Sequence, residues 1–473
     1  MEDVPDRRTK HLTFNDESPV APPGAIGRKD LIMASESKGA AFTRRGFLGL
    51  AGGVAATTLL AACSGGSGGG STGGGSSTPL KFWNMPWGGT TFNSTDKKIT
   101  LAYKPASGLP SATYQEIQWA NFAQTFSSAI SSNTGPAVSS GGGTQAFQYA
   151  AQGKIAYADD LINSWSSNGL QADFLPGLLD TMKTDQGYAA IPYNLDVRCS
   201  WYNKTLLQQA GVDNPTTWDE YKAVCAALKK IGVYGFGLGS GAGNFTGGHI
   251  MVGFMINNGG GLFNTNKEPA AVTPENEEAI DFILELVQKG YSDPASATYT
   301  SANIQSQWNA KKFGFGWDGA GLATGLKVVN DMVVGDPLKS PSGKQGFLYF
   351  PNNIMMYKNT PSQKGSEAFL TYYYKHMSKL WTDKTGIGLP PLTSIANTSV
   401  VKSDPAVSKI LSEWNPVYGT WAAPGGKGLF ANIAYTVDGT QPMITFAQSI
   451  LGGKTTAKAA LGTLQNSIEG LMK

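Results

Sequence analysis

The feature that most constrains the fold is the stretch from 188 to 230, where a strand pattern runs directly into two helices. Residues 195–202 have the apolar character of a strand, and a short helix is expected over 204–210. Gly211 is expected to end that helix, because glycine adopts the left-handed backbone conformation without a steric penalty. A similar strand–helix pattern starts at Pro79, so the chain is expected to have an α/β fold.

The second helix of this stretch carries its own start signal. Asn214-Pro215 breaks the chain, Thr216 or Thr217 can cap the next helix, and Glu220 is placed to complete a capping box. Apolar or aromatic residues then recur at helical spacing at Tyr221, Val224, Cys225 and Leu228. One face of this helix is therefore predicted to be buried.

These residues resemble a known family. The segments IPYNLDVRCSWYNKTLLQQAGV and PTTWDEYKAVCAALKK resemble the signature region of the extracellular solute-binding proteins of ABC sugar importers, the group that includes maltose-binding protein. Tyr202-Asn203, Ala210-Gly211 and the Thr-Trp-Asp-Glu run that starts at Thr217 fall in register with that signature. The similarity of pattern extends over nearly all of residues 79–473.

The resemblance implies a two-lobed, periplasmic-binding-protein-like fold. Each lobe has a central sheet flanked by helices, and a hinge with several chain crossings joins the lobes. We expect residues 79–195 and 309–345 to form the first lobe, and residues 196–308 and 346–473 to form the second. The resemblance also implies a receptor that closes on a sugar, without catalysis, and delivers it to membrane permease subunits.

The first 63 residues read as an export signal. The run TRRGFL at 43–48 matches a twin-arginine motif, and the apolar run that follows is too short and too rich in Gly and Ala for a stable membrane span. Leu60-Ala61-Ala62-Cys63 is a lipobox. The alternatives are a chance apolar segment or an uncleaved anchor. We interpret the chain as an exported bacterial lipoprotein whose mature form begins at Cys63.

Lipidation of Cys63 would hold the protein on the outer face of the cytoplasmic membrane. Several acyl chains anchor a protein stably, whereas one anchors it only marginally. Residues 64–78 consist only of Gly, Ser and Thr, and such a tether reaches roughly 20 Å.

Composition argues against nucleic acid as a partner. After residue 63, 29 Lys and Arg residues face 27 Asp and Glu residues, and only 15% of the whole chain is charged. Nucleic-acid binding requires a stronger basic field. The chain has 11 tryptophans, all after residue 63. Most large aromatic residues serve cores, but this number also suits stacking against the C–H faces of a neutral sugar.

The first-lobe candidates follow two predicted strands. A strand is expected over 80–83 and another over 136–139, with a further strand over 99–103 and a helix that includes Tyr114. Ligands of open α/β sheets lie at the carboxyl ends of the strands, and the family places first-lobe contacts in these two loops. The glycine run at 141–143 lacks the Lys-Ser/Thr of a phosphate loop. The candidate contacts are Trp83, Asn84, Trp87, Ser140 and Gly141.

The strongest second-lobe candidates are Asp196 and Arg198. Arg198 is the only arginine after the leader, which suggests a site that needs the planar guanidinium fork rather than a lysine. The two residues lie two apart on a predicted strand, so they share a face. The resemblance implies that the acidic residue at the Asp196 position contacts sugar. The alternative is a structural ion pair between lobe and hinge.

Other candidate contacts lie further along the chain. Trp317 and Asp318 end a predicted strand that resembles the family's return strand into the first lobe, while Trp421 could serve as a stacking platform or as a packed loop residue. His249 and Asp438 complete the candidate set of ligand contacts.

Binding is favoured over other activities. We expect no metal and no cofactor, because no Cys/His/Asp group has metal spacing. Asp196, Asp318 and Asp438 could in principle supply the carboxylate pair of a secreted glycoside hydrolase. A receptor of the same fold for a peptide, polyol or other non-sugar solute is the other alternative. We expect a monomeric binding protein rather than an enzyme.

Cys199 and Cys225 are the thiols that remain after lipidation of Cys63. Export places them in an oxidising compartment, where a disulfide is one outcome and two free thiols the other.

Overall fold

The computed structural model describes residues 78–119, 122–421 and 437–472. These residues belong to one compact unit, Ser71–Lys473. The predicted leader, its lipobox with Cys63 and almost all of the tether lie outside the described residues. In the part of the chain that is described, no helix is long and apolar enough to cross a membrane.

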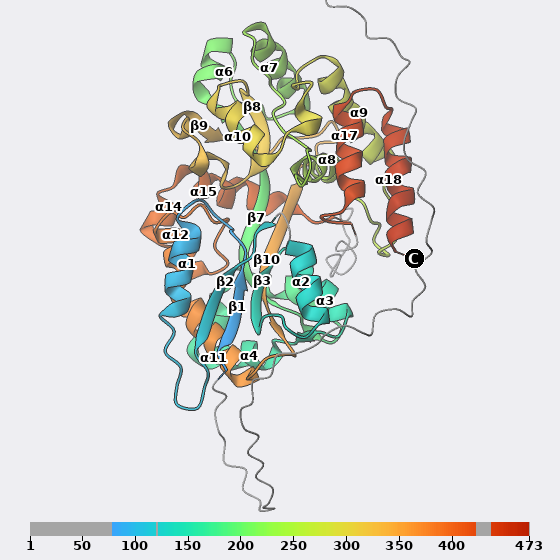
Figure 1. Ribbon diagram of the computed structural model, residues 1–473. Helices are drawn as coiled ribbons and strands as arrows, with labels where there is room; N and C mark the ends of the chain where they lie inside the picture. The colour runs from blue at the N-terminus through green and yellow to red at the C-terminus, as the bar shows by residue number, and fades with distance from the viewer. Residues whose placement is uncertain (1–77, 120–121, 422–436, 473) are drawn as a thin grey trace, which may run out of the picture. The chain divides into compact units, whose positions relative to one another are not determined.

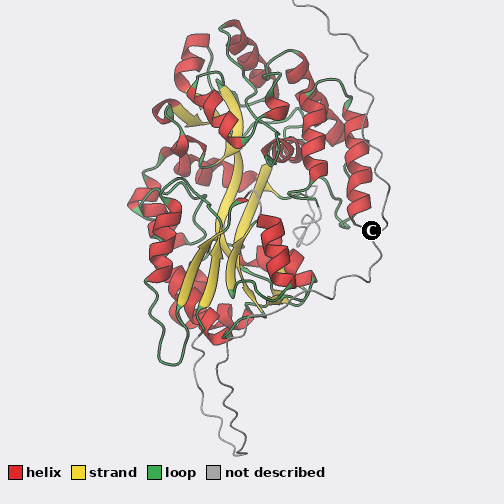
Figure 2. Ribbon diagram, in the orientation of Figure 1, coloured by secondary structure: helices red, strands yellow, loops and turns green. Residues whose placement is uncertain are grey.

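A mixed β-sheet runs through the unit (Figures 1 and 2), with the path β2-β1-β3-β10-β7-β8. Strands β1, β2 and β3 are parallel, and β10 joins β3 and β7 antiparallel. The strands on this path are β1 (Leu80–Asn84), β2 (Ala112–Glu116), β3 (Val138–Gly141), β7 (Ile191–Asn203), β8 (Phe315–Gly319) and β10 (Phe347–Tyr357). Short strands complete the set: β4 (Ile155–Ala156), β5 (Lys183–Thr184), β6 (Gly187–Tyr188), β9 (Met332–Val334) and β11 (Tyr418–Gly419).

The helices divide between two groups of hydrophobic clusters, which we call the first-lobe and second-lobe cores. Around the first-lobe core lie α1 (Phe92–Leu101), α2 (Phe122–Ser131), α3 (Gln145–Ala151), α4 (Asp159–Ser164), α5 (Leu170–Asp173), α11 (Gln363–His376), α12 (Lys379–Thr382), α13 (Thr393–Ala396) and α14 (Ser399–Lys402). Around the second lie α6 (Lys204–Ala210), α7 (Trp218–Lys230), α8 (Thr246–Asn257), α9 (Pro274–Gln288), α10 (Ser301–Asn309), α15 (Pro405–Lys409), α17 (Gln441–Leu451) and α18 (Ala457–Leu471). The α/β, two-core organisation agrees with the expected fold class.

Strands β7 and β10 belong to both lobes. Ile191 and Tyr193 at the start of β7 lie in the first-lobe core, whereas Cys199 and Trp201 near its end lie in the second-lobe core. β10 runs the opposite way, from Phe347 in the second-lobe core to Met356 in the first. The two antiparallel strands therefore carry the chain between the lobes (Figure 1).

The packing groups two segments differently from the expected lobe boundaries. The buried residues from Phe313 to Leu338 pack in the second-lobe core, because β8 pairs with the second-lobe half of β7. Most buried residues of segment 354–401 pack in the first-lobe core. This differs from the lobe boundaries expected from the sequence, which place segment 309–345 in the first lobe and segment 346–473 in the second.

The expected end of α6 at Gly211 and the expected start of α7 at Thr217 are both confirmed. Gly211 ends α6 with a φ of 68°, and Thr217 caps α7 by accepting from the backbone N of Glu220 at 3.2 Å. The Glu220 carboxylate accepts from the backbone N of Thr216, at 2.7 Å, instead of from that of Thr217. The N-cap at Thr217 is therefore confirmed, but the bond that would complete the expected capping box is made to the preceding residue.

Two first-lobe predictions were wrong. The expected strand at 99–103 is the end of α1, whose buried face contains Phe92, Asp96, Ile99 and Thr100. The expected helix at Tyr114 is strand β2 instead. The buried polar residues Asp96 and Thr100 break the apolar periodicity by which a helix is read from sequence.

The two cysteines are free thiols in the structure. Cys199 on β7 and Cys225 on α7 are both buried, and burial raises the pKa of both thiols above the ordinary value. Because the thiolate is the reactive form, neither is expected to react readily in the folded protein.

Candidate functional site

The candidate site is built around Arg198 in the middle of β7. Its guanidinium donates from Nη1 to Asp196 Oδ1 at 2.6 Å and contacts His249 Nδ1 through Nη2 at 3.1 Å. His249 Nε2 in turn lies 2.9 Å from Asp438 Oδ1. We call Asp196, Arg198, His249, Phe350, Trp421 and Asp438 the Arg198 cluster. The structure therefore brings four polar candidates predicted from the sequence into one connected group.

The ring of Phe350 closes the cluster from the side of β10. The guanidinium carbon of Arg198 lies 4.9 Å from the centre of the Phe350 ring, within the range of a cation–π contact. His249 and Trp421 pack on the same ring at centroid distances of 4.6 and 5.8 Å. Arg198 is thus held by an ion pair, a histidine and an aromatic face, a set of contacts that lysine could not reproduce.

The charge state of Arg198 follows from these partners. Burial by itself lowers the pKa of Arg198, but attraction to Asp196, with smaller contributions from Asp318 and Asp438, raises it above the ordinary value. The side chain of Arg198 is 11% exposed and that of Asp196 is 34% exposed. Arg198 therefore stays positively charged and largely buried, whereas the carboxylate of Asp196 beside it is accessible to solvent.

His249 is the neutral member of the cluster. Burial lowers its pKa below the ordinary 6.5, although Asp438 opposes this effect. A neutral imidazole with its proton on Nε2 satisfies both neighbours, because Nδ1 then accepts from Arg198 and Nε2 donates to Asp438. Protonation of Nδ1 would place a second donor against the guanidinium.

The cluster also touches the first lobe. Gly143, in the loop after β3, lies against Phe350 so closely that a Cβ there would be 3.4 Å from the Phe350 Cβ. In the same loop, the Gly142 carbonyl accepts from Asn353 Nδ2 of β10 at 3.2 Å. The predicted first-lobe loop and the Arg198 cluster therefore meet at β10.

Asp318 lies beside the cluster at the end of β8. Residue pairing places Arg198 opposite Gly319, and a Cβ on Gly319 would lie 3.3 Å from Asp196 Oδ1. Asp318 accepts from the Gly319 backbone N at 2.7 Å, and burial raises its pKa above the ordinary value. Its negative charge contributes to the raised pKa of Arg198.

In the first lobe, three predicted residues share one hydrogen-bonded group. Trp87 Nε1 donates to Asn84 Oδ1 at 3.0 Å and to Ser140 Oγ at 2.9 Å. Asn84 and Ser140 are fully buried, whereas Trp87 is half-buried. Gly141 follows Ser140 at the end of β3, and a Cβ there would overlap the Met355 side chain. Asn84 and Ser140 therefore hold the Trp87 indole, and Gly141 permits close packing against β10.

Sequence reasoning missed Trp119 and Phe350. Trp119 is 40% exposed and meets Trp87 edge to face at 4.7 Å between ring centroids. Its Nε1 donates to the Pro86 carbonyl at 2.9 Å. An exposed tryptophan next to a predicted contact is a signal that only the fold can supply. Phe350 was missed because it lies in a largely apolar strand, where a phenylalanine is expected to be a core residue.

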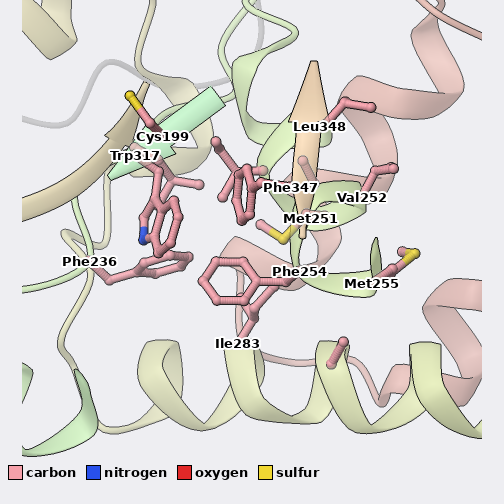
Figure 3. Close-up of a cluster of buried hydrophobic side chains, with 14 of the residues drawn as sticks. Cys199, Phe236, Met251, Val252, Phe254, Met255, Ile283, Trp317, Phe347 and Leu348 are labelled. Atoms are coloured by element: carbon pink, nitrogen blue, oxygen red, sulfur yellow. The ribbon is translucent and has the colours of Figure 1, made fainter. Parts of the chain in front are cut away.

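Two tryptophans predicted as ligand contacts are core residues. Trp317 is 1% exposed, stacks on Phe347 at 4.6 Å and is surrounded by apolar side chains (Figure 3). Trp83 is 6% exposed and packs edge to face on Phe126 at 5.4 Å. Trp83 therefore belongs to the first-lobe core and Trp317 to the second-lobe core. Trp421 is 3% exposed, which favours the packed alternative at that position.

Within the described ranges, no group of three or more His, Cys, Asp or Glu side chains could hold a metal ion. The Arg198 cluster is a polar surface bounded by aromatic rings.

Comparison with known proteins places the chain in a family. Residues 74–379 match the model of the bacterial extracellular solute-binding proteins. A sugar transporter protein from Arthrobacter chlorophenolicus A6, solved with bound laminaribiose, is 43% identical, with a TM-score of 0.79 over 84% of this chain and all of that one. Maltose-bound MalE3 of T. maritima is 14% identical, with a TM-score of 0.69 over 83% of this chain and 99% of that one, and shares the fold.

Sequence comparison with curated proteins also finds binding proteins. A binding protein of Brucella abortus (strain 2308) is 22% identical over 284 residues, which cover 59% of this chain and 67% of that protein. The family match covers well over half of the chain, and the two-lobed fold is shared with solved sugar-binding proteins. This chain therefore belongs to the family of bacterial extracellular solute-binding proteins.

Proposed function

We propose that this protein is the lipid-anchored, extracellular receptor of an ABC importer, and that it captures a short oligosaccharide by lobe closure. The observation that carries the proposal is the position of the Arg198 cluster. It lies on β7 and β10, the two strands shared by the lobes, and it touches the first-lobe loop at Gly143. A ligand bound there would contact both lobes, so its binding would favour the closed arrangement.

The chemistry of the site supports a neutral, hydroxyl-rich ligand. Asp196 offers a partly exposed acceptor next to the guanidinium, and the paired rings of Trp87 and Trp119 offer an apolar surface in the first lobe. Sugars combine hydroxyl groups at the ring edge with C–H groups on the ring face. The two parts of the site match these two parts of a sugar.

We propose laminaribiose, or a short glucose oligomer with the same linkage, as the ligand to test first. The proposal rests on the 43% identity to the laminaribiose-bound A. chlorophenolicus protein over its full length. Isothermal titration of the purified mature protein with laminaribiose, cellobiose and maltose should show saturable binding with laminaribiose strongest. A melting-temperature screen that responds to amino acids or polyols but not to sugars would contradict the sugar assignment.

The same samples distinguish a receptor from a hydrolase. After incubation with laminaribiose and longer oligosaccharides, chromatography should recover every sugar intact. Appearance of shorter fragments at a rate above the buffer control would instead support the glycoside hydrolase alternative.

The first-lobe contact can be tested with two variants. Trp119→Ala and Trp87→Ala should each weaken sugar binding by about tenfold or more, because a stacking surface is lost. Trp381→Phe, a conservative change at a tryptophan of the first-lobe core, is the matched control and should leave affinity unchanged. Normal affinity in both test variants would contradict the placement of the sugar against these rings.

The membrane anchor has its own test. Replacement of Cys63 by Ala should release the exported protein from membranes into the medium, because the acceptor of the lipid is gone. Replacement of Arg44 and Arg45 by Lys should retain the precursor inside the cell. Membrane retention of the Cys63→Ala protein would point to an uncleaved hydrophobic anchor.

A further inference from the structure

One fully buried carboxylate in the first lobe has no part in the site as described so far. Asp96 on α1 is 0% exposed. Its Oδ1 accepts from the Tyr373 hydroxyl at 2.5 Å, and its Oδ2 accepts from the side-chain amide of Asn84. Burial of a carboxylate is costly unless hydrogen bonds compensate, so a buried aspartate points to a specific role for its partners.

Asn84 is the partner that connects Asp96 to the site. Its Nδ2 donates to Asp96 and lies 3.3 Å from the Tyr193 hydroxyl, whereas its Oδ1 accepts from the Met85 backbone N and from Trp87 Nε1, both at 3.0 Å. An amide has a donor end and an acceptor end. An ionised carboxylate only accepts, so it selects the donor end of Asn84 and leaves the acceptor end facing Trp87.

If the Asn84 amide were reversed, Nδ2 would face two N–H groups, those of Met85 and Trp87. The Trp87 indole would then keep only Ser140 Oγ, at 2.9 Å, as an acceptor. The Trp87 indole lies perpendicular to that of Trp119, and its centroid is 6.2 Å from that of the Tyr193 ring. The orientation of the Trp87–Trp119 pair therefore depends on which end of the Asn84 amide faces it.

We propose that Asp96 is a positioning residue for the sugar-binding surface: through the Asn84 amide it sets the orientation of the Trp87 indole. The effect on sugar affinity rests on the proposed function, because it requires Trp87 to contact the ligand. The effect on the indole itself does not.

Three variants separate positioning from simple stability. Asp96→Leu keeps the branching of the side chain but removes the acceptor, and it should weaken laminaribiose binding by about threefold to tenfold, the equivalent of one hydrogen bond. Asp96→Asn can still present an oxygen to Asn84 and should restore affinity to within about twofold. Tyr373→Phe removes the donor to the other Asp96 oxygen, so it should lower the melting temperature and leave affinity unchanged.

The indole provides a readout that needs no ligand. In protein labelled with ¹⁵N, the Trp87 Nε1–H resonance is identified by its loss in Trp87→Phe. In Asp96→Leu this resonance should shift and exchange faster with solvent, while Tyr373→Phe should leave it in place. An unchanged Trp87 resonance in Asp96→Leu overturns the proposal, whatever happens to sugar binding.

If Asp96→Leu does not fold, the wild type itself carries the test. Burial raises the pKa of Asp96 to about 6. The titratable groups that face it are the phenols of Tyr114 on β2, Tyr193 on β7 and Tyr373 on α11, and burial raises the pKa of all three above 10. Protonation of Asp96 removes its charge and weakens the hydrogen bond from Asn84, so the Trp87 resonance should shift with a midpoint near pH 6 in the wild type and should not titrate in Asp96→Asn. A Trp87 resonance that is constant from pH 4 to 8 in the wild type overturns the proposal.

The two proposals can fail separately. A shifted indole resonance in Asp96→Leu together with normal sugar affinity in Trp87→Phe would support positioning and contradict the sugar contact. Weak sugar binding in Trp87→Phe with an unchanged indole in Asp96→Leu would give the reverse result.

Discussion

Arg198 shows how much of this site depends on single side chains. One guanidinium contacts a carboxylate, a histidine and an aromatic ring that come from β7, α8 and β10. The contact with His249 joins residues 51 apart in the chain, and His249 reaches Asp438 a further 189 residues along. Arg198 and Asp196 form an ion pair at 2.6 Å. This pair is compatible both with binding of a ligand and with a purely structural role.

The first prediction tests these two roles. Asp196→Asn removes a charged acceptor, and Arg198→Lys removes the guanidinium fork that reaches His249. Because hydrogen bonds to charged groups contribute roughly 1.5–3 kcal/mol, each change should lower sugar affinity by about tenfold to a hundredfold in calorimetric titration. Reduced melting temperature without ligand, combined with normal affinity, would instead assign the pair to structure alone.

The second prediction concerns the ionisation of Asp96. Its folded-state pKa of about 6 lies above the ordinary 3.8, so the folded protein holds a proton that the unfolded chain releases. The contribution of Asp96 to stability is therefore highest below pH 3.8 and is lost as the pH rises through 6, by about 3 kcal/mol in total. Denaturant titrations between pH 4 and 7 should show this loss as the difference between wild type and Asp96→Asn. A constant difference across that range would contradict the raised pKa.

At the scale of elements, β7 and β10 account for both the stability and the position of the site. Along β7 the residues alternate between the site and the core, so Asp196 and Arg198 face the cluster while Val197 and Cys199 lie in the second-lobe core. The bulge in the β7–β10 pairing falls between Asn352 and Asn353, next to the glycine loop after β3. The side chains of the site are thus placed by two strands that pack in the first-lobe core at one end and in the second-lobe core at the other.

The third prediction follows from the burial of Trp317 on β8. Because its indole stacks on Phe347 and donates to the Tyr221 hydroxyl at 3.2 Å, Trp317→Ala should lower the free energy of unfolding by about 3–5 kcal/mol. Sugar affinity of the folded fraction should remain close to that of the wild type. Chemical denaturation and calorimetry on the same preparation measure both quantities. A loss of affinity without loss of stability would restore Trp317 to the site.

At the scale of the whole molecule, the two lobes have separate cores that meet along the shared strands. The second-lobe core contains both free cysteines, which pack among apolar side chains on β7 and α7. Export into an oxidising compartment alone does not determine a disulfide, because bond formation also requires the two side chains to approach with the correct geometry.

The fourth prediction is a thiol count. The mature protein should react slowly with a thiol reagent when folded, and it should reveal two thiols per chain once denatured without reductant. The physical reason is burial, which excludes the reagent and raises the pKa of both thiols. Fewer than two thiols in the denatured, unreduced protein would indicate a disulfide.

The sequence by itself determined the features that depend on neighbouring residues. Gly211 ends α6 and Thr217 begins α7 because backbone conformation and helix caps are local properties. The signature around Tyr202-Asn203 was sufficient to indicate the family, and the lone Arg198 indicated that its position was special. Local pattern failed at α1, where the buried Asp96 and Thr100 interrupted the apolar spacing.

Only the tertiary structure decided which residues meet. Trp317 and Trp87 are the same residue type near strand ends, yet one is sealed in the second-lobe core and the other is half-exposed beside Trp119. Arg198, His249, Phe350 and Asp438 come together because the antiparallel pairing of β7 with β10, and the packing of α8 against them, fold distant segments onto one another. Contacts of this kind depend on how whole elements pack, so they cannot be predicted from the spacing of residues along the chain.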